Sequence, residues 1–597
     1  MKLYKLYIGL GLLAMGGGIT SCSSDYLDQP PITSIDNTQI GESIEAARAA
    51  LYGLCQAMYC GFYGDNSDRN NSGEAWFQTY YGDAGSPDFW DSFIWGYQSE
   101  FQNWSLMRRN TYWGSRNAWM YGYNLIGQAN SILDVIDNVP ASADEVNFVK
   151  AQALTIRAHG YIRLMQVYGP RYEDSKNGQE LCVILKDKPG LDPLPLSNYA
   201  DCMAFIYKDL NTAIDLFKGS SVQRTFGYEP NLNVAQGLFS RIALLNHDWQ
   251  LAADMAKEAR QGFPIMTPDA YRTGFIEPTS EWLWYNDPDN TYVGYRSWGA
   301  SYACNGAYAI AYNWSGAGCI SFRLYDQIYE RSKDDVRCEF FWTPDKANKY
   351  AALGILRKDF WDPKYVNEEY EFMYGPSTST DAATKTANEK MSAAIALFSK
   401  NMNPDPTVFT ESAFGTDLSI TEKTASSAVS RKIWFNSLPA TTVNTCQPGA
   451  QLKFWSYPES QYNASSHPFL RSSELLLTQA EAELELGHDA TALQLLIELN
   501  SQRIPDYTCN LTGDALREEI RLYRRMELWG EGDCWFSFKR WNTTISRNKW
   551  EANDPTSDTF LPAYEGTYEP SYANGWRYLI PTAETNYNPL VADQLNQ

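Results

Sequence analysis

Two stretches of the chain, far apart in the sequence, follow the same helix–turn–helix plan. Residues 232–260 contain a helical apolar pattern, a tight polar turn and a second helical pattern, and residues 473–503 repeat this order. Each turn contains a His-Asp pair, with His247 and His488 at positions that we take as equivalent. Helical hairpins of this kind bury their apolar faces by stacking on one another, so they predict a helical scaffold.

Three further segments place apolar residues at helical spacing: 42–59, 118–140 and 145–169. Pro140 and the Gly169-Pro170 pair end the second and third of them, because proline cannot continue a helix. The hairpins resemble the tetratricopeptide type, although their period is not regular enough for an array. The fold class that we predict is mainly α.

The rest of the chain has a different composition. Residues from about 261 to 470 are rich in Pro, Gly, Asn and Asp, which is typical of loops with short strands. We therefore predict one body, residues 41–597, in which tetratricopeptide-like hairpins carry a large, mixed, loop-rich binding region. The scaffold lies mainly in 42–60, 113–260 and 470–541, and the binding region mainly in 61–112 and 261–469.

The N-terminus has the features of an export signal. Lys2 and Lys5 precede an apolar run over residues 7–15, and three glycines lead into Ile19-Thr20-Ser21-Cys22. An aliphatic residue and two small ones before a cysteine resemble the bacterial lipobox, which predicts acylation of Cys22 after removal of residues 1–21. Residues 22–40 would then form a lipid-anchored linker. The alternative is a plain secretory peptide with a chance cysteine at its end.

Net charge limits the possible partners, and cysteine spacing limits the possible metal sites and disulfides. The net charge of −22 argues against a nucleic-acid partner, because phosphate binding needs a basic face. None of the 11 cysteines forms a C-x-x-C pair, and no Cys/His spacing indicates zinc. Cys304 and Cys319 flank a glycine-rich loop and are the first disulfide pair to test. Most other cysteines are expected to be small buried apolar residues.

Six segments resemble, in order, those of the SusD/RagB-like outer-membrane nutrient-binding lipoproteins. They are SCSSDYLDQPP (21–31), AQALTIRAHGYIRLMQVYGP (151–170), SFRLYDQIYERSKDDVR (321–337), LRSSELLLTQAEAELELG (470–487), REEIRLYRRMELWGEGDCWFSFKRW (517–541) and YLIPTAETNYNPLVADQLNQ (578–597). The resemblance implies a surface-exposed, non-catalytic lipoprotein of the outer membrane. Such a protein captures oligosaccharide and delivers it to a TonB-dependent, SusC-like transporter, without a cofactor. A peptide-binding member, a surface glycoside hydrolase and a structural adhesin are the alternatives.

The charged residues within these segments are expected to serve the scaffold. They lie on predicted helices, where pairing across packing surfaces or at helix ends satisfies them. This set comprises Arg157, Arg163, Glu474, Glu481, Arg524, Arg525, Glu527 and Glu531. Arg540 and Trp541 should form a stacked, bidentate anchor, given the planar fork of arginine.

Aromatic residues gather in two turn-rich segments, 74–113 and 281–319, among Gly, Asn, Asp and Ser. Flat rings beside short polar groups suit a sugar, because the ring stacks on the pyranose C–H face while polar groups bind the hydroxyls. The candidate carbohydrate-binding residues are Trp76, Asp83, Trp90, Trp95, Tyr295, Arg296, Trp298, Tyr302, Asn305 and Trp314, with Asp88 and Asp91 as further polar candidates. The alternative for each is burial under a loop, and Trp104, Trp113 and Trp119 are expected to pack against the helix at 118.

The sequence offers little for catalysis. It contains no H-E-x-x-H, G-x-S-x-G or P-loop motif, and its four histidines are scattered. The oxygen-rich stretch 65–74 lacks the ordered spacing of a calcium loop. A glycoside hydrolase needs only two well-placed carboxylates, so the sequence alone leaves that possibility open. We expect no cofactor, no metal and no enzymatic activity.

Overall fold

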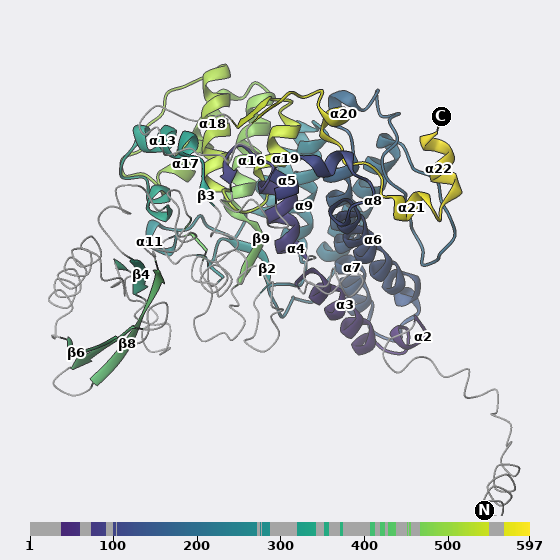
Figure 1. Cartoon of the computed structure of the whole chain (residues 1–597). Helices are drawn as coiled ribbons and strands as arrows, with labels where there is room; N and C mark the ends of the chain where they lie inside the picture. Colours follow the sequence, from purple (N-terminus) through teal and green to yellow (C-terminus); the bar gives the residue numbers. More distant parts are fainter. Residues whose placement is uncertain are drawn as a thin grey trace, which may run out of the picture.

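Helices dominate the structure, as Figure 1 shows. The computed structural model describes residues 37–59, 73–90, 99–102, 104–271, 275, 278–286, 319–341, 451, 453–454, 466–547 and 566–596, and the backbone of five strands between 352 and 437. The longer helices are α3 (Ile44–Tyr59), α6 (Trp113–Val135), α7 (Ala143–Tyr168), α8 (Tyr199–Lys218), α9 (Leu232–Leu245), α10 (Trp249–Ala259), α13 (Phe322–Arg331), α16 (Ser472–Glu485), α17 (Asp489–Asn500), α18 (Gly513–Glu527) and α19 (Cys534–Arg540). The predicted fold class, mainly α with tetratricopeptide-like hairpins, is confirmed.

The hairpins stack into one continuous scaffold. Helix α6 packs on α7, α7 on α8, α8 on α9 and α9 on α10. Helix α10 then packs on α16, and α16 on α17, so the hairpin α9–α10 lies beside the hairpin α16–α17 although a long stretch of chain separates them. The two hairpins recognised in the sequence are therefore neighbouring units of the same stack.

Side-chain caps begin helices α7, α8 and α9 at the expected residue types. Ser142 accepts a hydrogen bond from the Glu145 N–H before α7, Asn198 accepts from Asp201 before α8, and Asn231 accepts from Val234 before α9. Each cap satisfies one of the N–H groups that the first helical turn leaves without a partner.

The turns of the two hairpins correct one prediction. His247 has φ +56° and donates its N–H to the Leu244 carbonyl, whereas in the other hairpin Gly487 has φ +81° and donates to Leu484. His488 instead donates to Glu483, as Asp248 does to Ala243. His247 therefore corresponds to Gly487 and not to His488. The two histidines differ by one position, and His247 adopts a left-handed conformation that glycine adopts more readily.

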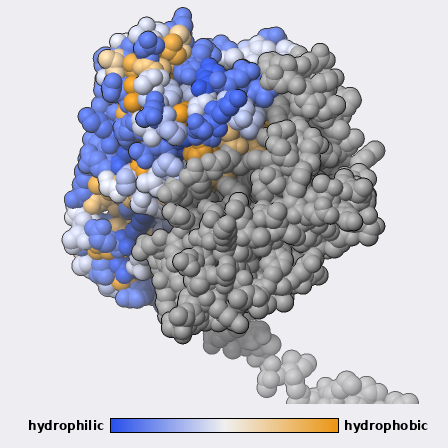
Figure 2. Space-filling view, turned by 90° about the vertical axis from the view of Figure 1, so that its left-hand side faces the viewer, coloured by the Kyte–Doolittle hydropathy of each residue, from blue (hydrophilic) through white to orange (hydrophobic). Residues whose placement is uncertain are grey.

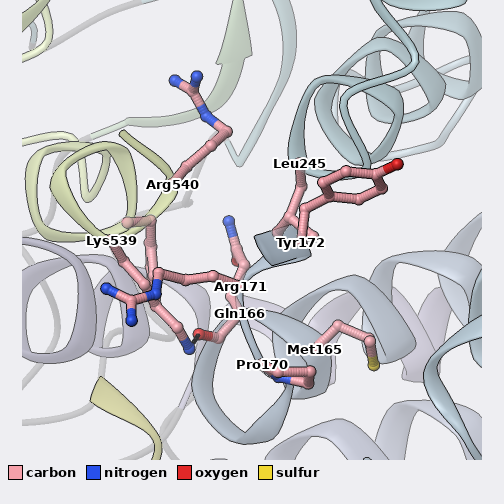
Figure 3. A pocket seen from close by; sticks show the side chains of 9 residues that line it. Met165, Gln166, Pro170, Arg171, Tyr172, Leu245, Lys539 and Arg540 are labelled. Atoms are coloured by element: carbon pink, nitrogen blue, oxygen red, sulfur yellow. Dashed lines mark hydrogen bonds between the residues drawn. The ribbon is translucent and has the colours of Figure 1, made fainter. Parts of the chain in front are cut away.

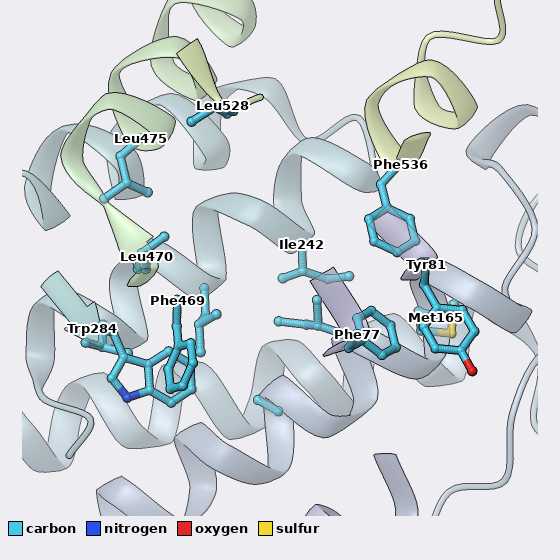
Figure 4. Packing of buried hydrophobic residues seen from close by; sticks show 14 of the residues in the cluster. Phe77, Tyr81, Met165, Ile242, Trp284, Phe469, Leu470, Leu475, Leu528 and Phe536 are labelled. Atoms are coloured by element: carbon cyan, nitrogen blue, oxygen red, sulfur yellow. The ribbon is translucent and has the colours of Figure 1, made fainter. Parts of the chain in front are cut away.

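Helix α7 lies at the centre of the scaffold and is buried along most of its length. It crosses α6 at close range, since a Cβ on Gly160 would come within 3.0 Å of the Gly122 carbonyl oxygen. Because α7 is buried on all sides over most of its length, its sequence has no continuous polar face. Its buried polar side chains form hydrogen bonds and ion pairs with neighbouring elements, as described below. Figure 4 shows how side chains from α7, α9, α16 and α19 pack together with residues from two strands.

The described strands pair antiparallel, and most of them are short. Strand β1 (Phe89–Trp90) pairs with β3 (Cys319–Ile320), β2 (Trp282–Asn286) with β9 (His467–Arg471), and β10 (Ile545–Arg547) with β11 (Gly566–Tyr568). A five-stranded sheet has the order β5-β4-β8-β7-β6, with strands Glu371–Met373, Ala352–Leu356, Ala428–Ser437, Leu418–Lys423 and Pro406–Glu411. Short strands in residues 261–470 agree with the prediction, although the segment also contains helix α13.

The described part of the first aromatic segment is more helical than its composition predicts. Residues 74–108 contain α4 (Glu74–Phe77), the π-helical turn η2 (Gln78–Asp83), α5 (Ser99–Gln102) and η3 (Ser105–Arg108). Gly82 of η2 meets Gly532 so closely that a Cβ on Gly82 would lie 2.3 Å from the Gly532 carbonyl oxygen. The aromatic residues of α4 and η2, Trp76, Phe77, Tyr80 and Tyr81, are all buried and belong to the core.

The chain returns to the scaffold at its C-terminal end. The short helices α20 (Ala573–Trp576), α21 (Thr582–Thr585) and α22 (Pro589–Leu595) follow β11, and the Tyr578 N–H donates to the Val167 carbonyl at the end of α7. The face shown in Figure 2 is mainly hydrophilic where it is described, with hydrophobic residues in small separate patches. None of the helices in the described residues is long and apolar enough to cross a membrane.

Candidate functional site

Two of the predicted carbohydrate-binding residues lie in the interior. Trp76 in α4 is 8% exposed, and its ring packs against Tyr80 at a centroid distance of 4.3 Å and against Phe101 at 5.5 Å. Asp83 at the end of η2 is 1% exposed and accepts a hydrogen bond of 2.7 Å from the Gly532 N–H. Aromatic packing leaves no open face on Trp76 for a sugar, and both residues serve the core instead.

The other predicted site residues are described only in part. Trp90 has its backbone placed in β1. The remaining predicted residues lie outside the described part of the chain: Cys22, Trp95, Tyr295, Arg296, Trp298, Tyr302, Asn305 and Trp314, together with Asp91 and Cys304.

The structure joins the two aromatic segments at one point. Strand β1 belongs to the first segment and β3 to the end of the second, and they pair antiparallel with Phe89 opposite Ile320 and Trp90 opposite Cys319. This pairing could not be read from the sequence, since it joins short segments far apart in the chain. The chain on either side of the ladder, residues 91–98 and 287–318, carries most of the predicted aromatic candidates.

Asp88 fixes this ladder to helix α18. Its carboxylate accepts from Arg525 Nε at 2.6 Å and from Arg525 Nη2 at 2.5 Å. Its carbonyl oxygen accepts from Trp529 Nε1 at 2.9 Å and from the Ser321 N–H at 3.0 Å. Asp88 is 1% exposed. It is therefore a support for the ladder, and not one of the sugar ligands for which it was a candidate.

Strand β2 provides a second fixed point, at the beginning of the second aromatic segment. Trp282 and Trp284 are 1% and 0% exposed, and Trp284 Nε1 donates to the Tyr228 carbonyl at 2.8 Å. The pairing of β2 with β9 then holds the strand against the scaffold. Strands β2 and β3, which flank residues 287–318 in the sequence, are thus both paired with strands of the described part of the chain.

A buried ionic cluster lies beside strands β2 and β9. Arg471 at the end of β9 donates to Glu281 at 2.7 Å and to Glu527 at 2.9 Å. Arg503 also binds Glu527, at 3.0 Å, and Lys453 binds Glu531 at 2.6 Å. The cluster contains the cations Arg337, Lys453, Arg471 and Arg503 and the carboxylates Glu281, Asp335, Glu527 and Glu531.

Electrostatics keeps this cluster ionised. Burial acts to raise the pKa of Glu527, but Arg503, Arg471 and Arg337 hold it well below its usual value. A carboxylate buried without such partners would be neutral or strongly destabilising. Sequence reasoning missed Glu281, Lys453 and Arg503. The available signal was a charge set directly beside apolar residues, such as Glu281 before Trp282-Leu283-Trp284.

The charged residues of the sequence motifs have the predicted scaffold roles. Arg157 pairs with Asp209, Arg163 with Glu74, Arg241 with Glu474, Arg524 with Asp533, Arg525 with Asp88, and Arg471 with both Glu527 and Glu531. Arg540 donates from both terminal nitrogens to Glu481, and Trp541 Nε1 donates to the same carboxylate at 2.7 Å. The stacked, bidentate anchor predicted for Arg540 and Trp541 is confirmed, with the guanidinium carbon 5.6 Å from the ring centroid. Trp104, Trp113 and Trp119 pack into the core, also as predicted.

One small cavity lies between α7, α9 and α19 (Figure 3). Its volume of about 20 Å³ is room for about one water molecule, which is too small for a sugar ring. Lys539 at its wall donates to the Gln166 and Gly169 carbonyls at 2.8 and 2.9 Å, and thus caps the end of α7. Burial, together with Arg577 and Arg171, lowers the pKa of Lys539 well below its usual value. The cavity is a packing feature of the scaffold. None of its lining residues comes from the two aromatic segments.

In the described ranges, no group of three or more His, Cys, Asp and Glu side chains is arranged to hold a metal ion.

Two family models match the chain. The family model described as SusD family matches residues 280–597, and the model described as starch-binding associating with outer membrane matches residues 25–244. No protein with a curated description is significantly similar in sequence.

Solved structures share the fold at low sequence identity. A SusD-like carbohydrate binding protein from Bacteroides vulgatus ATCC 8482 is similar with a TM-score of 0.64 and 17% identity, over 92% of this chain and 98% of that chain. A SusD superfamily protein from Bacteroides thetaiotaomicron VPI-5482 has a TM-score of 0.62 and 19% identity, over 92% and 99% of the two chains. Since one family model matches more than half of its 597 residues, the chain belongs to the SusD family.

Proposed function

We propose that this protein is a lipid-anchored, cell-surface protein that binds oligosaccharides and delivers them to a TonB-dependent, SusC-like outer-membrane transporter. The observation that carries the proposal is the β1–β3 ladder, in which the two aromatic segments recognised in the sequence meet. Family membership supports carbohydrate as the ligand, since one matching model is described as starch-binding associating with outer membrane.

The binding residues that we propose are the predicted candidates on either side of the ladder. They are Trp90, Trp95, Tyr295, Arg296, Trp298, Tyr302, Asn305 and Trp314. The rings would stack on the apolar faces of the sugars, and the arginine and amide would bind hydroxyl groups. The rigid supports at Asp88 and at β2 would limit how much the binding segments must be ordered by the ligand, which lowers the entropic cost of binding.

Affinity electrophoresis across a panel of polysaccharides, starch included, tests this proposal. We expect at least one polysaccharide to retard the protein, whereas Trp249→Ala, on scaffold helix α10, should leave that retardation unchanged. Failure of every polysaccharide to retard the protein, with peptides quenching its tryptophan fluorescence, would instead assign it to peptide binding.

We further propose that the protein binds glycans without hydrolysing them. In support, the carboxylates Glu281 and Glu527 are 0% exposed and engaged with arginine, so a substrate does not reach them. Incubation of the retarding polysaccharide with the protein should release no reducing ends. Release of reducing ends that a single carboxylate substitution abolishes would establish a glycoside hydrolase.

Exposed apolar side chains support a docking surface for the transporter. Asn588 Nδ2 donates to the Leu194 carbonyl, which holds α21 and α22 beside residues 186–196. Several large apolar residues on these segments face solvent, Leu191 at 98% and Tyr587 at 84% exposure. Exposed apolar residues that gather in one place are typical of interaction sites.

Replacing both Leu191 and Tyr587 by Ser should reduce co-purification of the transporter while leaving retardation by the polysaccharide unchanged. Unchanged co-purification would exclude this surface.

The lipid anchor is tested at Cys22. Cys22→Ser should leave folding and glycan binding intact and release the protein from the membrane fraction, because the acyl chains alone hold it there. A variant that stays in the membrane fraction would contradict the anchor.

A further inference from the structure

The connection between α7 and α8 is long for a compact scaffold. Residues 169–198 contain only the short 3₁₀ turn η5 (Tyr172–Asp174) and an isolated bridge between Leu181 and Asn198. Connections of this length without secondary structure are uncommon and need to be held in place. The loop also receives the C-terminal segment, since Arg577 Nη2 donates to the Leu181 carbonyl at 2.7 Å. An interaction that holds this loop in place therefore also supports its contact with the C-terminal segment.

Two cysteines meet where this loop closes. Cys182 donates its N–H to the Ser197 carbonyl at 2.9 Å, and its Sγ lies 3.3 Å from the Glu180 carbonyl. Cys202, in the first turn of α8, places its Sγ 4.0 Å from the same Ser197 carbonyl. Both cysteines thus contact the Ser197 carbonyl, one through its N–H and the other through its thiol, and both are free thiols that are 0% exposed.

We propose that Cys182 and Cys202 form a disulfide in the exported protein. The proposal rests on the export signal of the proposed function, because disulfides persist in oxidising compartments outside the cytoplasm. The shared contact with the Ser197 carbonyl brings the two residues together at the closed end of the loop, where a bond between them would join the loop to α8. The disulfide would link the loop to α8 and thereby hold the contacts between the loop and the C-terminal segment.

The chemistry is an exchange between two dithiol–disulfide pairs. The thiols of Cys182 and Cys202 lose two hydrogens and form one S–S bond, and the S–S bond of a thiol–disulfide oxidoreductase is reduced to two thiols. The neighbouring Cys202 side chain and burial raise the pKa of the Cys182 thiol, which leaves little reactive thiolate in the folded state. Oxidation should therefore take place during folding, before α8 covers the pair.

Mass spectrometry of the wild-type protein tests the pair directly. Protein from the cell envelope is denatured in iodoacetamide and digested without reduction. We expect a cross-linked peptide pair that contains unalkylated Cys182 and Cys202, while Cys55, which is also buried, is alkylated. Alkylation of both Cys182 and Cys202, or a bond from either one to another cysteine, would overturn the proposal.

A second preparation separates this outcome from a failure of the export assignment. The chain without residues 1–21, made in a reducing cytoplasm, is unfolded and refolded with oxidised and reduced glutathione. If the bond forms there but not in envelope protein, the disulfide proposal is overturned for the cell and export becomes doubtful. If it forms in neither, the pair itself is refuted.

Thermal unfolding supplies an independent readout. Dithiothreitol should lower the Tm of the oxidised wild type by several degrees and leave the Tm of the Cys182→Ala/Cys202→Ala double variant unchanged, because only the wild type has a bond to lose. Cys55→Ala should respond to dithiothreitol as the wild type does. An equal Tm for the wild type with and without dithiothreitol would contradict a stabilising bond.

Discussion

Trp90 and Cys319 are backbone partners in the antiparallel ladder of β1 and β3. Each belongs to one of the two aromatic segments that composition alone singles out as candidate sugar-binding regions. The ladder is only two residues long, so its strength comes from Asp88, whose carboxylate bonds to Arg525 of α18 and whose carbonyl oxygen accepts from Trp529, just after that helix. The scaffold and the candidate site are thus linked through one buried aspartate.

Asp88→Ala should therefore weaken both stability and glycan binding. It leaves the Arg525 guanidinium without its carboxylate, and breaking a buried pair on one side costs about 3–5 kcal/mol. We expect a fall of about this size in the free energy of unfolding, measured with urea, together with weaker glycan affinity. Lys150→Ala, which removes the partner of the exposed Asp137, should cost less than about 1 kcal/mol. A stable Asp88 variant with unchanged affinity would show that the ladder does not support the site.

The ionic cluster predicts a second large effect. Glu527→Gln keeps the size of the side chain but removes a charge that faces Arg337, Arg471 and Arg503. The excess positive charge would be buried, so we expect a loss of about 3–5 kcal/mol in the free energy of unfolding or failure to fold. Glu518→Gln, at the exposed end of an i,i+3 pair on α18, is the matched control. A loss below about 1 kcal/mol for Glu527→Gln would contradict the importance of the cluster.

Sequence reasoning succeeded where residues act locally. Helical spacing and proline placed the helix from 145 to 169 within two residues at the N-terminal end and one at the C-terminal end of α7 (143–168). Charged motif residues on helices, such as Arg540, were correctly assigned to pairs across packing surfaces. These predictions depend on period and on the cost of an unpaired buried charge, and both can be read from one segment.

Sequence reasoning failed where distant segments of the chain form the environment of a residue. Trp76 and Asp83 have the neighbours of loop residues in the sequence, yet contacts with Phe101 and Gly532 bury them. The predicted equivalence of His247 and His488 was wrong for a different reason. The two turns contain the same His-Asp pair, but the residue with positive φ precedes His488 by one position in the second turn. Pairing of β1 with β3 involves too few residues to leave a pattern in either strand.

His467 should make the protein sensitive to acid. Burial lowers its pKa to about 3, against about 6.5 in an unfolded chain. Below pH 6.5 the unfolded chain takes up a proton that the folded protein does not, so stability is lost at about 1.4 kcal/mol per pH unit as the pH falls toward 3. His467→Gln should flatten this slope in urea titrations between pH 6.5 and pH 4. An unchanged slope for His467→Gln would show that its ring is charged in the folded state.

Asp83 should produce the opposite dependence. Burial raises its pKa well above the usual value, against which the Gly532 N–H acts only partly. As pH rises past about 3.9, the unfolded chain loses a proton that the folded protein retains, so stability falls until the folded-state pKa is passed. Asp83→Asn should remove this loss, with a urea midpoint that gains on the wild type between pH 4 and pH 7. Asp215→Asn, on the exposed face of α8, serves as the control. A constant difference in midpoint across this range would contradict a raised pKa.

Isothermal titration calorimetry with the oligosaccharides of a retarding polysaccharide tests the central claim most directly. Trp90→Ala and Trp298→Ala should each weaken binding about tenfold or more, because each removes a stacking ring, while urea midpoints stay close to that of the wild type. Trp249→Ala should bind as the wild type does. Equal affinity of the wild type and both site variants would contradict a glycan site built from the two aromatic segments.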